Sequence, residues 1–374
     1  MTFSCEPDNS PRCQGAPGRE RPTAAPTRSG PQLVTLRDVA RRAGVSISTA
    51  STVVNGRDTA LPIRDATRER ILLAATELGY RPNLLARALR GSRSSLVGVI
   101  ARDIGDPFHI QVLRGIDEVA KRREYRLFLG HVDYRPEVAA IYGSMFEQSH
   151  ADGLIILGDL AGGDTPLDVI ADHNRYVVGV TDRVARRRVP GVYADNVRGT
   201  RLALDHLWDL GHRRIVCISD ARTADGRLRA DEYRRYMSER GMGDLVRVHH
   251  AAQPDPEPSY RLGRELFDRI DRPTRPTAVY AASDTIAIGL LRAAFQAGVP
   301  VPEGVSIVGF DDIDAAAYTV PPLTTVTQLG TEMGRIAARL LLDMVETERS
   351  PSEVADVVVE PSLVVRQSTA PAAG

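Results

Sequence analysis

The 374-residue chain is poor in cysteine, lysine and aromatic residues. Its three cysteines, Cys5, Cys13 and Cys217, match neither a metal-ligand spacing nor a disulfide framework, which argues against disulfide-stapled domains and zinc modules. Cys217 lies in the apolar run RRIVCISD, so we expect it in a hydrophobic core. Lys121 is the only lysine, and arginine therefore carries nearly all of the positive charge.

Several functional classes lack their sequence signals. No apolar run reaches the length of a membrane span, and the first residues lack the apolar segment of a secretory signal, so we expect a cytoplasmic protein. The motifs G-x-S-x-G, G-x-G-x-x-G, H-E-x-x-H and the phosphate-binding loop are missing. The aspartates of GDPFH and DDID match no calcium-loop spacing. We therefore expect no enzyme activity, no metal and no cofactor.

Charge is present but unevenly placed. The formal net charge is zero, yet residues 31–91 hold ten arginines against five acidic residues. Residues 92–374 hold 34 basic and 40 acidic residues. A basic amino-terminal module on a mildly acidic body indicates nucleic-acid contact at that end.

The amino-terminal region divides into a tail and a helical unit. Residues 1–30 are rich in Pro, Gly, Ser, Thr and Arg without hydrophobic periodicity. They form either a disordered tail or the product of a start codon placed too far upstream. Residues 34–80 are predicted to form three helices. Thr35 with Asp38 resembles a capping box, Gly44 ends the first helix, and Ser46 caps the second.

The spacing of apolar residues predicts the core of this helical unit. The first two helices are expected to bury Leu36, Val39, Ala40, Val45, Ala50 and Val54. The apolar face of the third helix is expected to hold Ile71, Leu72, Ala75 and Leu78.

Five hydroxyl residues crowd the second helix, within residues 46–52. Short hydroxyl side chains and a helix N-terminus can donate to phosphates and let the backbone approach a DNA groove. The alternative is an ordinary helical hairpin inside a larger domain. Residues 81–92 follow as a predicted hinge helix of about two turns, which is too short to be stable alone. The alternative there is a surface linker that happens to be rich in Leu and Ala.

From residue 95 to 368, β-rich runs alternate with helical ones. This alternation predicts parallel sheets flanked by helices, with ligands bound beyond the carboxyl ends of the strands. We predict an all-α helix-turn-helix head followed by an α/β core of two lobes with a cleft between them. The family resemblance described below implies that lobe one lies at about 95–194 and 328–345, and lobe two at about 195–327 and 354–368.

The run TLRDVARRAGVSISTASTVVN resembles the helix-turn-helix of the LacI/GalR (lactose-repressor) family of bacterial transcription regulators. GYRPNLLARALRG resembles that family's hinge helix. ADGLIILG, HLWDLGHRRIVCIS, AVYAASDTIAIGLLRAAFQAGVPVPEGVSIVGFDDID and PPLTTV resemble its periplasmic-binding-protein-like core. The motifs occur in the family's order, from about Val34 to Arg366. The resemblance implies a DNA-binding repressor whose operator affinity is set allosterically by a small effector, most often a sugar.

The resemblance also assigns DNA contacts by position. Phosphate contacts fall on Ser46, Thr49, Ser51 and Asn55, and base-edge contacts fall on Ile47, Ser48 and Thr52. In the hinge, Leu89 falls on a minor-groove wedge, Leu85 and Ala86 lie near the helix pair, and Arg87 and Arg90 meet phosphates. Thr52 replaces a common arginine, which removes a bidentate guanine contact worth about 1–3 kcal/mol of discrimination. The loop GRDTALPIRDA also looks longer than usual, so the operator sequence stays open.

The effector contacts of the family fall on Asp182, Arg229, Ser283 and Asp311, with Asp106 and Phe108 on the other wall. Asp182 is predicted to end a strand and Arg229 to start a helix. Carboxylates accept hydrogen bonds from hydroxyl pairs and a guanidinium donates to them, so this set suits a polyol. For each position alone, helix capping or a turn is the alternative. Pro254 stands where several members place an aromatic ring over the ligand.

Two other functions compete with a ligand-responsive regulator. A solute-binding protein of a transport system would share the core but need a signal peptide and no head. A sugar-processing enzyme with an appended helical domain would need a catalytic constellation. We expect a homodimer on a pseudo-palindromic operator. A ligand is expected to close the two lobes about crossover strands near Asp195 and Gln328, and so to change the spacing of the hinge helices.

Overall fold

The computed structural model describes residues 34–54, 63–80, 93–160, 165–181, 189–253, 255–268 and 275–372. The predicted tail and the predicted hinge helix lie outside these ranges. The chain divides into two compact units between Asn83 and Leu84, and each unit is described by itself. In the described part, no helix is both long and apolar enough to cross a membrane.

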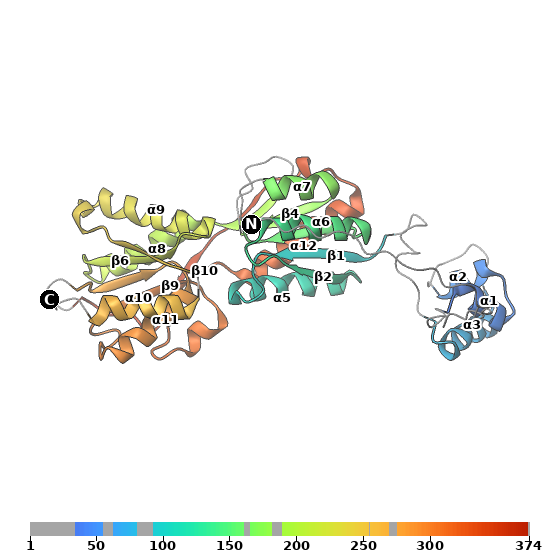
Figure 1. Cartoon of the computed structure of the whole chain (residues 1–374), viewed down its shortest axis with the longest axis horizontal. Coiled ribbons are helices and arrows are strands. Elements are labelled where there is room, and N and C mark those ends of the chain that lie inside the picture. The colour runs from blue at the N-terminus through green and yellow to red at the C-terminus, as the bar shows by residue number, and fades with distance from the viewer. Residues whose placement is uncertain are drawn as a thin grey trace, which may run out of the picture. The chain divides into compact units, whose positions relative to one another are not determined.

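The first unit packs α1 (Leu36–Ala43), α2 (Ile47–Val54) and α3 (Asp65–Glu77) around one small core (Figure 1). At the start of α1, the backbone N–H and the hydroxyl of Thr35 donate to the Asp38 carboxylate at 2.9 and 2.6 Å. Gly44 ends α1 with a φ of 64°, which glycine adopts without a Cβ clash. The Thr49 N–H donates to Ser46 Oγ at 3.1 Å. The predicted helix boundaries in this region are therefore confirmed.

The core of this unit is formed mainly by small residues, which lets the helices approach closely. Its buried members are Val39, Ala40, Ala43, Ala50, Val53, Ile71 and Ala74. The predicted apolar face of the third helix was partly wrong, because Leu72 is 47 % exposed and Ala74 is buried instead. Ile71 and Ala74 lie three residues apart and share one stripe, whereas Leu72 points about 100° further round the helix.

Lobe one of the second unit is a parallel sheet covered by helices on both faces. Its strand order is β11-β5-β4-β3-β1-β2. The strands are β1 (Leu96–Ala101), β2 (Arg126–His131), β3 (Gly153–Leu157), β4 (Val177–Val180), β5 (Gly191–Ala194) and β11 (Val357–Val359). One face carries α5 (Pro107–Arg122) packed on α12 (Gly330–Thr347), and the other carries α6 (Pro136–Gln148) and α7 (Thr165–His173) (Figure 1). The inner strands β1, β3, β4 and β5 are buried almost throughout, as expected of a sheet covered on both faces, whereas the edge strands β2 and β11 are partly exposed.

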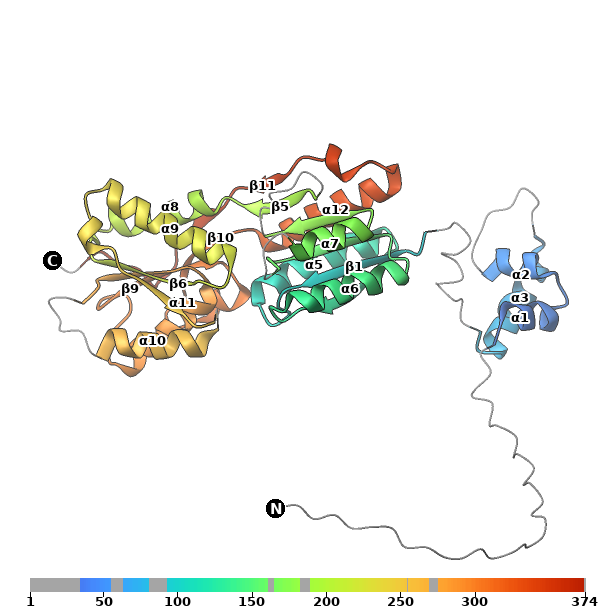
Figure 2. The same ribbon diagram turned by 45° about the horizontal axis from the view of Figure 1, so that its top comes forward.

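Lobe two repeats this architecture with the strand order β12-β10-β9-β8-β6-β7. The strands are β6 (Ile215–Asp220), β7 (Val248–Ala251), β8 (Ala278–Ala281), β9 (Ser306–Asp311), β10 (Thr324–Thr327) and β12 (Ser362–Val364). Within this sheet β12 pairs antiparallel to β10, and the other pairings are parallel. As Figure 2 shows, α8 (Asn196–Asp209) and α9 (Ala224–Glu239) lie over one face, and α10 (Pro256–Asp268) and α11 (Asp284–Gln296) lie over the other. The short helices are η1 (Gly243–Leu245), η2 (Asp314–Tyr318) and η3 (Pro351–Glu353).

The chain crosses between the lobes after β5, after β10 and between β11 and β12. The first two crossings pass through the predicted neighbourhoods of Asp195 and Gln328. The assignment of all of 354–368 to lobe two was wrong, because Val357–Val359 pairs in parallel with Val192–Ala194 of lobe one. Cys217 is fully buried, as predicted, in the core between the lobe-two sheet and the α8–α9 layer.

Candidate functional site

The exposed side of α2 carries the hydroxyl residues singled out in the sequence. Ser46, Ile47 and Ser48 are exposed, and Ile47 exposes 45 % of its surface. Thr49, Ser51 and Thr52 are half-buried. Ser46 Oγ lies 2.8 Å from both the Ser48 Oγ and the Thr49 Oγ1. This cluster at the first turn keeps spare acceptor and donor capacity, because a hydroxyl holds one proton and two lone pairs.

The remaining predicted DNA-contact residues cannot be placed, because they lie outside the described ranges. They are Asn55, Leu85, Ala86, Arg87, Leu89 and Arg90. Around the described helices, Arg42 pairs with Glu77 of α3 at 2.7 Å, which ties α1 to α3 on the surface of the unit.

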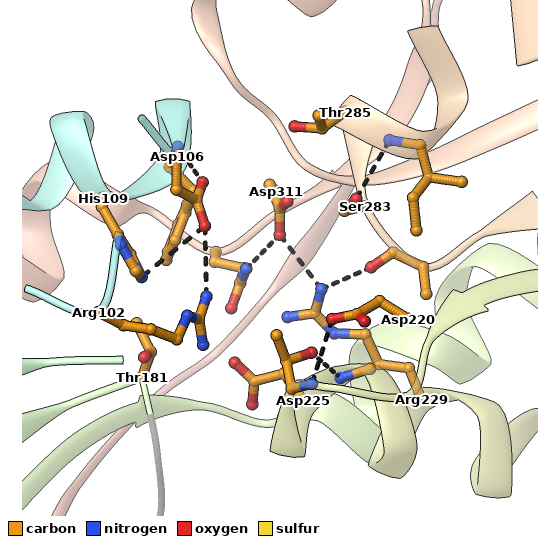
Figure 3. A pocket seen from close by; sticks show the side chains of 16 residues that line it. Arg102, Asp106, His109, Thr181, Asp220, Asp225, Arg229, Ser283, Thr285 and Asp311 are labelled. Carbon is orange, nitrogen blue, oxygen red and sulfur yellow. Dashed lines mark hydrogen bonds and ion pairs between the residues drawn. The ribbon is translucent and has the colours of Figure 1, made fainter. Parts of the chain in front are cut away.

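A cleft opens between the two lobes at the carboxyl ends of both sheets. Figure 3 shows its lining, which consists of Arg102, Asp106, Phe108, His109, Thr181, Asp220, Thr223, Asp225, Gly226, Arg229, Ala282, Ser283, Thr285, Ile286, Asp311 and Gln328. Of the predicted effector residues, the cleft brings together Asp106, Phe108, Arg229, Ser283 and Asp311. Asp182 and Pro254 lie outside the described residues.

Arg229 is the centre of the lobe-two wall. The prediction that it starts a helix was wrong, because α9 begins at Ala224 and Arg229 sits in its second turn. Its guanidinium donates to Asn196 Oδ1 at 2.8 Å, to the Ala282 carbonyl at 2.7 Å and to Asp311 Oδ1 at 3.2 Å. Gln328 donates to the same Asp311 oxygen at 2.6 Å. Asn196 and Gln328 follow the first two interlobe crossings, so this network joins the floor of the cleft to both.

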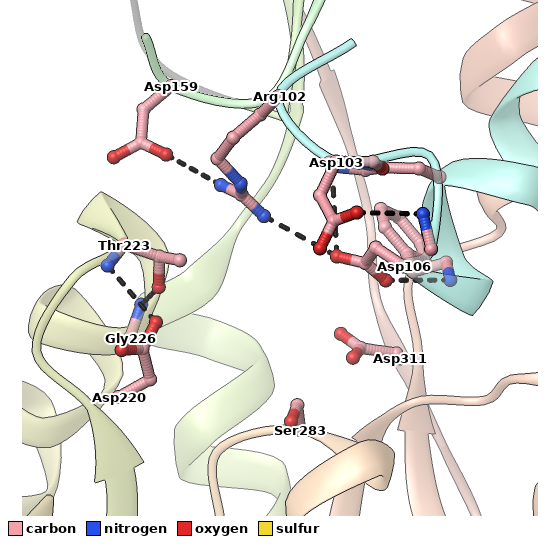
Figure 4. A network of polar contacts seen from close by, with 12 residues as sticks. Arg102, Asp103, Asp106, Asp159, Asp220, Thr223, Gly226, Ser283 and Asp311 are labelled. Atoms are coloured by element: carbon pink, nitrogen blue, oxygen red, sulfur yellow. Dashed lines mark hydrogen bonds and ion pairs between the residues drawn. The ribbon is translucent and has the colours of Figure 1, made fainter. Parts of the chain in front are cut away.

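Lobe one contributes a second arginine that the sequence reading missed. Arg102 follows β1 and is 6 % exposed. It donates to Asp159 Oδ1 at 2.6 Å and reaches Asp106 Oδ2 at 3.4 Å, as Figure 4 shows. Among the described residues, its buried Nε finds no hydrogen-bond partner. Asp106 caps α5 by accepting from the Phe108 N–H at 2.9 Å. The run of polar residues directly after β1 was the available signal, because strand-end side chains converge on such a cleft.

Several contacts bridge the two lobes around the cleft. Asp159 Oδ2 of lobe one accepts from the Ala224 N–H at the start of α9 in lobe two, at 2.9 Å. The Arg222 guanidinium of lobe two lies 3.9 Å from the centre of the Tyr134 ring of lobe one. On the α5 side, Gln111 donates to the Asp312 carbonyl at 2.9 Å. Lobe position is therefore fixed by a small set of polar contacts.

Burial sets the protonation of the cleft carboxylates. It raises the pKa of Asp311 to about 7, against the opposing effect of Arg229, and it also raises the pKa of Asp225. Burial lowers the pKa of the His109 imidazole, so His109 is neutral at pH 7 and its Nδ1 faces the Asp103 carbonyl at 2.8 Å. The cleft thus presents hydrogen-bond acceptors and fixed guanidinium donors together, which is the pairing that hydroxyl groups require.

Two further acidic residues near the cleft have structural partners. Asp284 accepts from the Ile313 N–H at 2.9 Å and from the Thr325 hydroxyl at 2.5 Å. Asp312 accepts from Arg366 at 2.7 Å. No group of three or more metal-binding side chains is arranged to hold a metal ion in the ranges that the structure describes.

The architecture defines a class of protein in which a small helical head precedes a two-lobed ligand-binding core. Residues 35–83 match the profile of bacterial regulatory proteins of the lacI family, and residues 204–369 match that of the periplasmic binding protein-like domain. The transcriptional regulator DegA of Bacillus subtilis is 32 % identical over 340 residues, covering 90 % of this chain and 98 % of DegA. The repressor CytR of Escherichia coli K12 is 31 % identical over 340 residues, covering 90 % and 96 %. The chain belongs to the LacI family of transcriptional regulators.

Solved structures support the same fold. A lac repressor dimer bound to operator and an anti-inducer is 26 % identical, with a TM-score of 0.76, and the match covers 91 % of this chain and all of that one. The regulator CelR in complex with cellobiose is 31 % identical, with a TM-score of 0.63 and coverage of 90 % and 99 %. A LacI-family regulator from Enterococcus faecium with bound ribose is 27 % identical, with a TM-score of 0.66 and coverage of 74 % and 100 %.

Proposed function

We propose that this chain is a homodimeric transcriptional repressor whose operator affinity is set by a sugar or a similar polyol bound in the interlobe cleft. The observation that carries the proposal is the hydrogen-bonded network of Arg229, Asp311, Asn196 and Gln328. It joins the ligand-facing side chains to the first two of the three interlobe crossings. A ligand that competes for Arg229 or Asp311 must disturb this network, and with it the relation between the lobes.

DNA binding is assigned to the exposed side of α2. The hydroxyls of Ser46 and Thr49 at its first turn suit phosphate oxygens. Ile47 and Ser48 follow the capping residue Ser46 and are exposed. We propose that they contact base edges, together with Thr52. Ile47 offers an apolar contact for a thymine methyl group. The hinge residues Leu85, Ala86, Arg87, Leu89 and Arg90 complete this interface as the family resemblance implies.

The effector class follows from the polar lining of the cleft. Arg229 and Arg102 supply donors from opposite lobes, and Asp106, Asp225 and Asp311 supply acceptors. A polyol carries hydroxyls that both donate and accept, so it can satisfy donors and acceptors from both walls at once. The relatives solved with cellobiose and with ribose support this class for the present cleft.

The ligand must first widen the cleft. Its volume in this structure is about 50 Å³, whereas small-molecule pockets typically measure about 300–1,000 Å³. A ligand therefore cannot simply close the lobes around itself. The contacts that Asp159 and Tyr134 make with lobe two must break first, so that the lobes open and admit the ligand. We propose that this rearrangement changes the spacing of the amino-terminal lobes in a dimer and so the pairing of the hinge segments.

Exposed apolar side chains on the second unit support a second copy as partner. On lobe one, Phe128 and Leu129 of the edge strand β2 are each 51 % exposed, and Ile141 of α6 is 57 % exposed. On lobe two, Tyr318 and Val320 are 86 % and 92 % exposed. If both lobes contact the second copy, a change in the angle between the lobes of one protomer also moves its partner. A dimer with twofold symmetry matches the symmetry of a pseudo-palindromic operator.

A thermal-shift screen of sugars and nucleosides tests the proposal, because a ligand that binds only the folded core raises its apparent stability. A hit must then change the affinity of the protein for its own upstream DNA. The operator must change the affinity for the hit by the same factor, since coupling between two sites is reciprocal. Equal ligand affinity with and without operator would refute the allosteric part. Arg229→Gln should abolish the ligand response and leave operator binding intact.

A further inference from the structure

A second cavity lies in lobe two at the amino ends of β6, β7 and β8, the opposite end of this sheet from the effector cleft. It measures about 310 Å³. The cavity is lined by residues at the start of β6, at the end of η1, in and just before β7, in α10, and at Pro276 just before β8. The lining residues are Arg214, Ile215, Val216, Leu245, Arg247, His249, Leu266 and Pro276.

The floor of this cavity is apolar and buried. Ile215 is fully buried, and Val216 and Leu266 are each 6 % exposed. Leu245 closes one side and is 36 % exposed. The cavity exists where β7 is the edge strand of the sheet. An apolar body placed here would leave water and contact these side chains directly.

The polar part of the cavity is basic. In the part of the chain that the structure describes, no acidic side chain lines it. Arg214 donates from Nε to the Arg275 carbonyl at 3.2 Å. Arg247 donates from one terminal nitrogen to the carbonyls of Asp244 and Val246 at 3.0 and 2.8 Å. These contacts with backbone carbonyls hold both guanidinium groups in place. Neither guanidinium pairs with a carboxylate among the described residues. Each therefore has N–H groups left to donate to an anion.

His249 adds a third nitrogen-bearing group. Burial lowers the pKa of its imidazole, and the neighbouring charges of His250 and Arg247 lower it further. His249 is therefore neutral at pH 7, and the lasting positive charge of the cavity belongs to Arg214 and Arg247.

We propose that this cavity is a second ligand site, separate from the effector cleft, which binds a small amphipathic anion: an apolar body on Val216, Leu245 and Leu266, with a carboxylate held by Arg214 and Arg247. The site differs from the effector cleft in both shape and chemistry. Apart from the neutral His249, the described residues that line the cavity are apolar side chains and positively charged arginines. The cleft is lined by both arginine donors and aspartate acceptors. A polyol therefore suits the cleft, and a fatty or aromatic carboxylate suits this cavity.

Octanoate, octanol and octylamine probe the site in the full-length protein. Octanoate should bind and shift the methyl resonances of Val216, Leu245 and Leu266. Octylamine should not bind measurably, and octanol should bind more weakly than octanoate. In the double variant Arg214→Gln/Arg247→Gln, the affinity for octanoate should fall about tenfold or more, because the charge-assisted hydrogen bonds to its carboxylate are lost.

Arg227→Gln is the matched control, because Arg227 is an exposed lobe-two arginine that also donates to two backbone carbonyls and does not line the cavity. Leu245→Trp fills the cavity without changing its charge and should block octanoate binding, while circular dichroism confirms that both cavity variants fold. The proposal is overturned if octanoate does not bind, if the double variant and Arg227→Gln bind it equally, or if octylamine binds as tightly as octanoate. These measurements use neither DNA nor a sugar, so their outcome is independent of the effector cleft.

Discussion

The contact between Arg222 and Tyr134 makes a direct test of how the lobes are held together. The guanidinium of Arg222 in lobe two stacks over the Tyr134 ring of lobe one at 3.9 Å. The Tyr134 hydroxyl is buried and has no hydrogen-bond partner in the part of the chain that the structure describes. A cation–π contact at a partly exposed site contributes about 0.5–1 kcal/mol, and about 2 kcal/mol when desolvated. We take about 1 kcal/mol, which equals about a fivefold change in the equilibrium between bridged and separated lobes.

The Ala224 N–H reports this equilibrium, because it donates across the cleft to Asp159 at 2.9 Å. Hydrogen exchange at this amide should be about fivefold faster in Arg222→Ala and in Tyr134→Leu, since lobe separation removes its acceptor. The double variant should exchange no faster than either single variant, because both changes remove the same contact. Asp159 itself is unchanged in all of these variants.

Arg234→Ala is the control, since Arg234 lies on α9 with Ala224 and pairs with Asp231 of the same helix at 2.7 Å. Its Ala224 amide should exchange at the wild-type rate. Unchanged exchange in both Arg222→Ala and Tyr134→Leu would show that this stack does not hold the lobes. Additive effects of the two substitutions would show that they act through different contacts.

Three further predictions concern protonation, packing and DNA contact. Because burial raises the Asp311 pKa to about 7, folded Asp311 binds its proton more tightly than the unfolded chain does, so stability falls as pH rises from about 4 to 7. Asp311→Asn should thus gain stability relative to wild type over that range, by on the order of a few kcal/mol, and a constant difference in urea melts would contradict this. Gly334→Ala should destabilise lobe one by about 1–3 kcal/mol, because a Cβ there would lie 2.0 Å from the Val112 carbonyl, whereas Gly243→Ala should be neutral in the same melts. Ser48→Asp should weaken operator binding more than non-specific DNA binding in anisotropy titrations, because it removes a base-edge contact and also places a negative charge on the DNA-facing turn. Unchanged binding would remove Ser48 from the interface.

Much of the architecture was predictable from local sequence signals. Gly44 and Ser46 set the turn between α1 and α2, since glycine adopts the φ of 64° found there without steric cost from a Cβ and a serine hydroxyl caps the next helix. The inner strands β1, β3, β4 and β8 are nearly continuous apolar runs, which is typical of strands buried on both faces. Strands β11 and β12 have three residues each, too short for a periodic pattern, and their division between the lobes depends on pairing rather than on composition.

The cleft was only partly predictable, for a physical reason. Asp311 and Ser283 end or follow strands, and strand-end polar residues converge. Arg102 also follows a strand, but its role depends on Asp159, which lies 57 residues further along the chain. Asp159 in turn reaches the start of α9 in the other lobe. Such contacts arise from how the lobes meet, and no local pattern in the sequence encodes them.

We propose that the hydroxyl-lined helix α2 binds DNA and that ligand binding in the polar interlobe cleft controls the DNA affinity. The most direct test of this proposal is the anisotropy titration of the purified protein on its own upstream DNA, at 50 and 200 mM salt, with and without the sugar that raises its thermal stability most. We predict tight binding that weakens steeply with salt, as phosphate contacts require. The sugar should shift the DNA affinity of the wild type but not that of Arg229→Gln. Binding that is absent at both salt concentrations, or equally shifted in both proteins, would contradict the proposal.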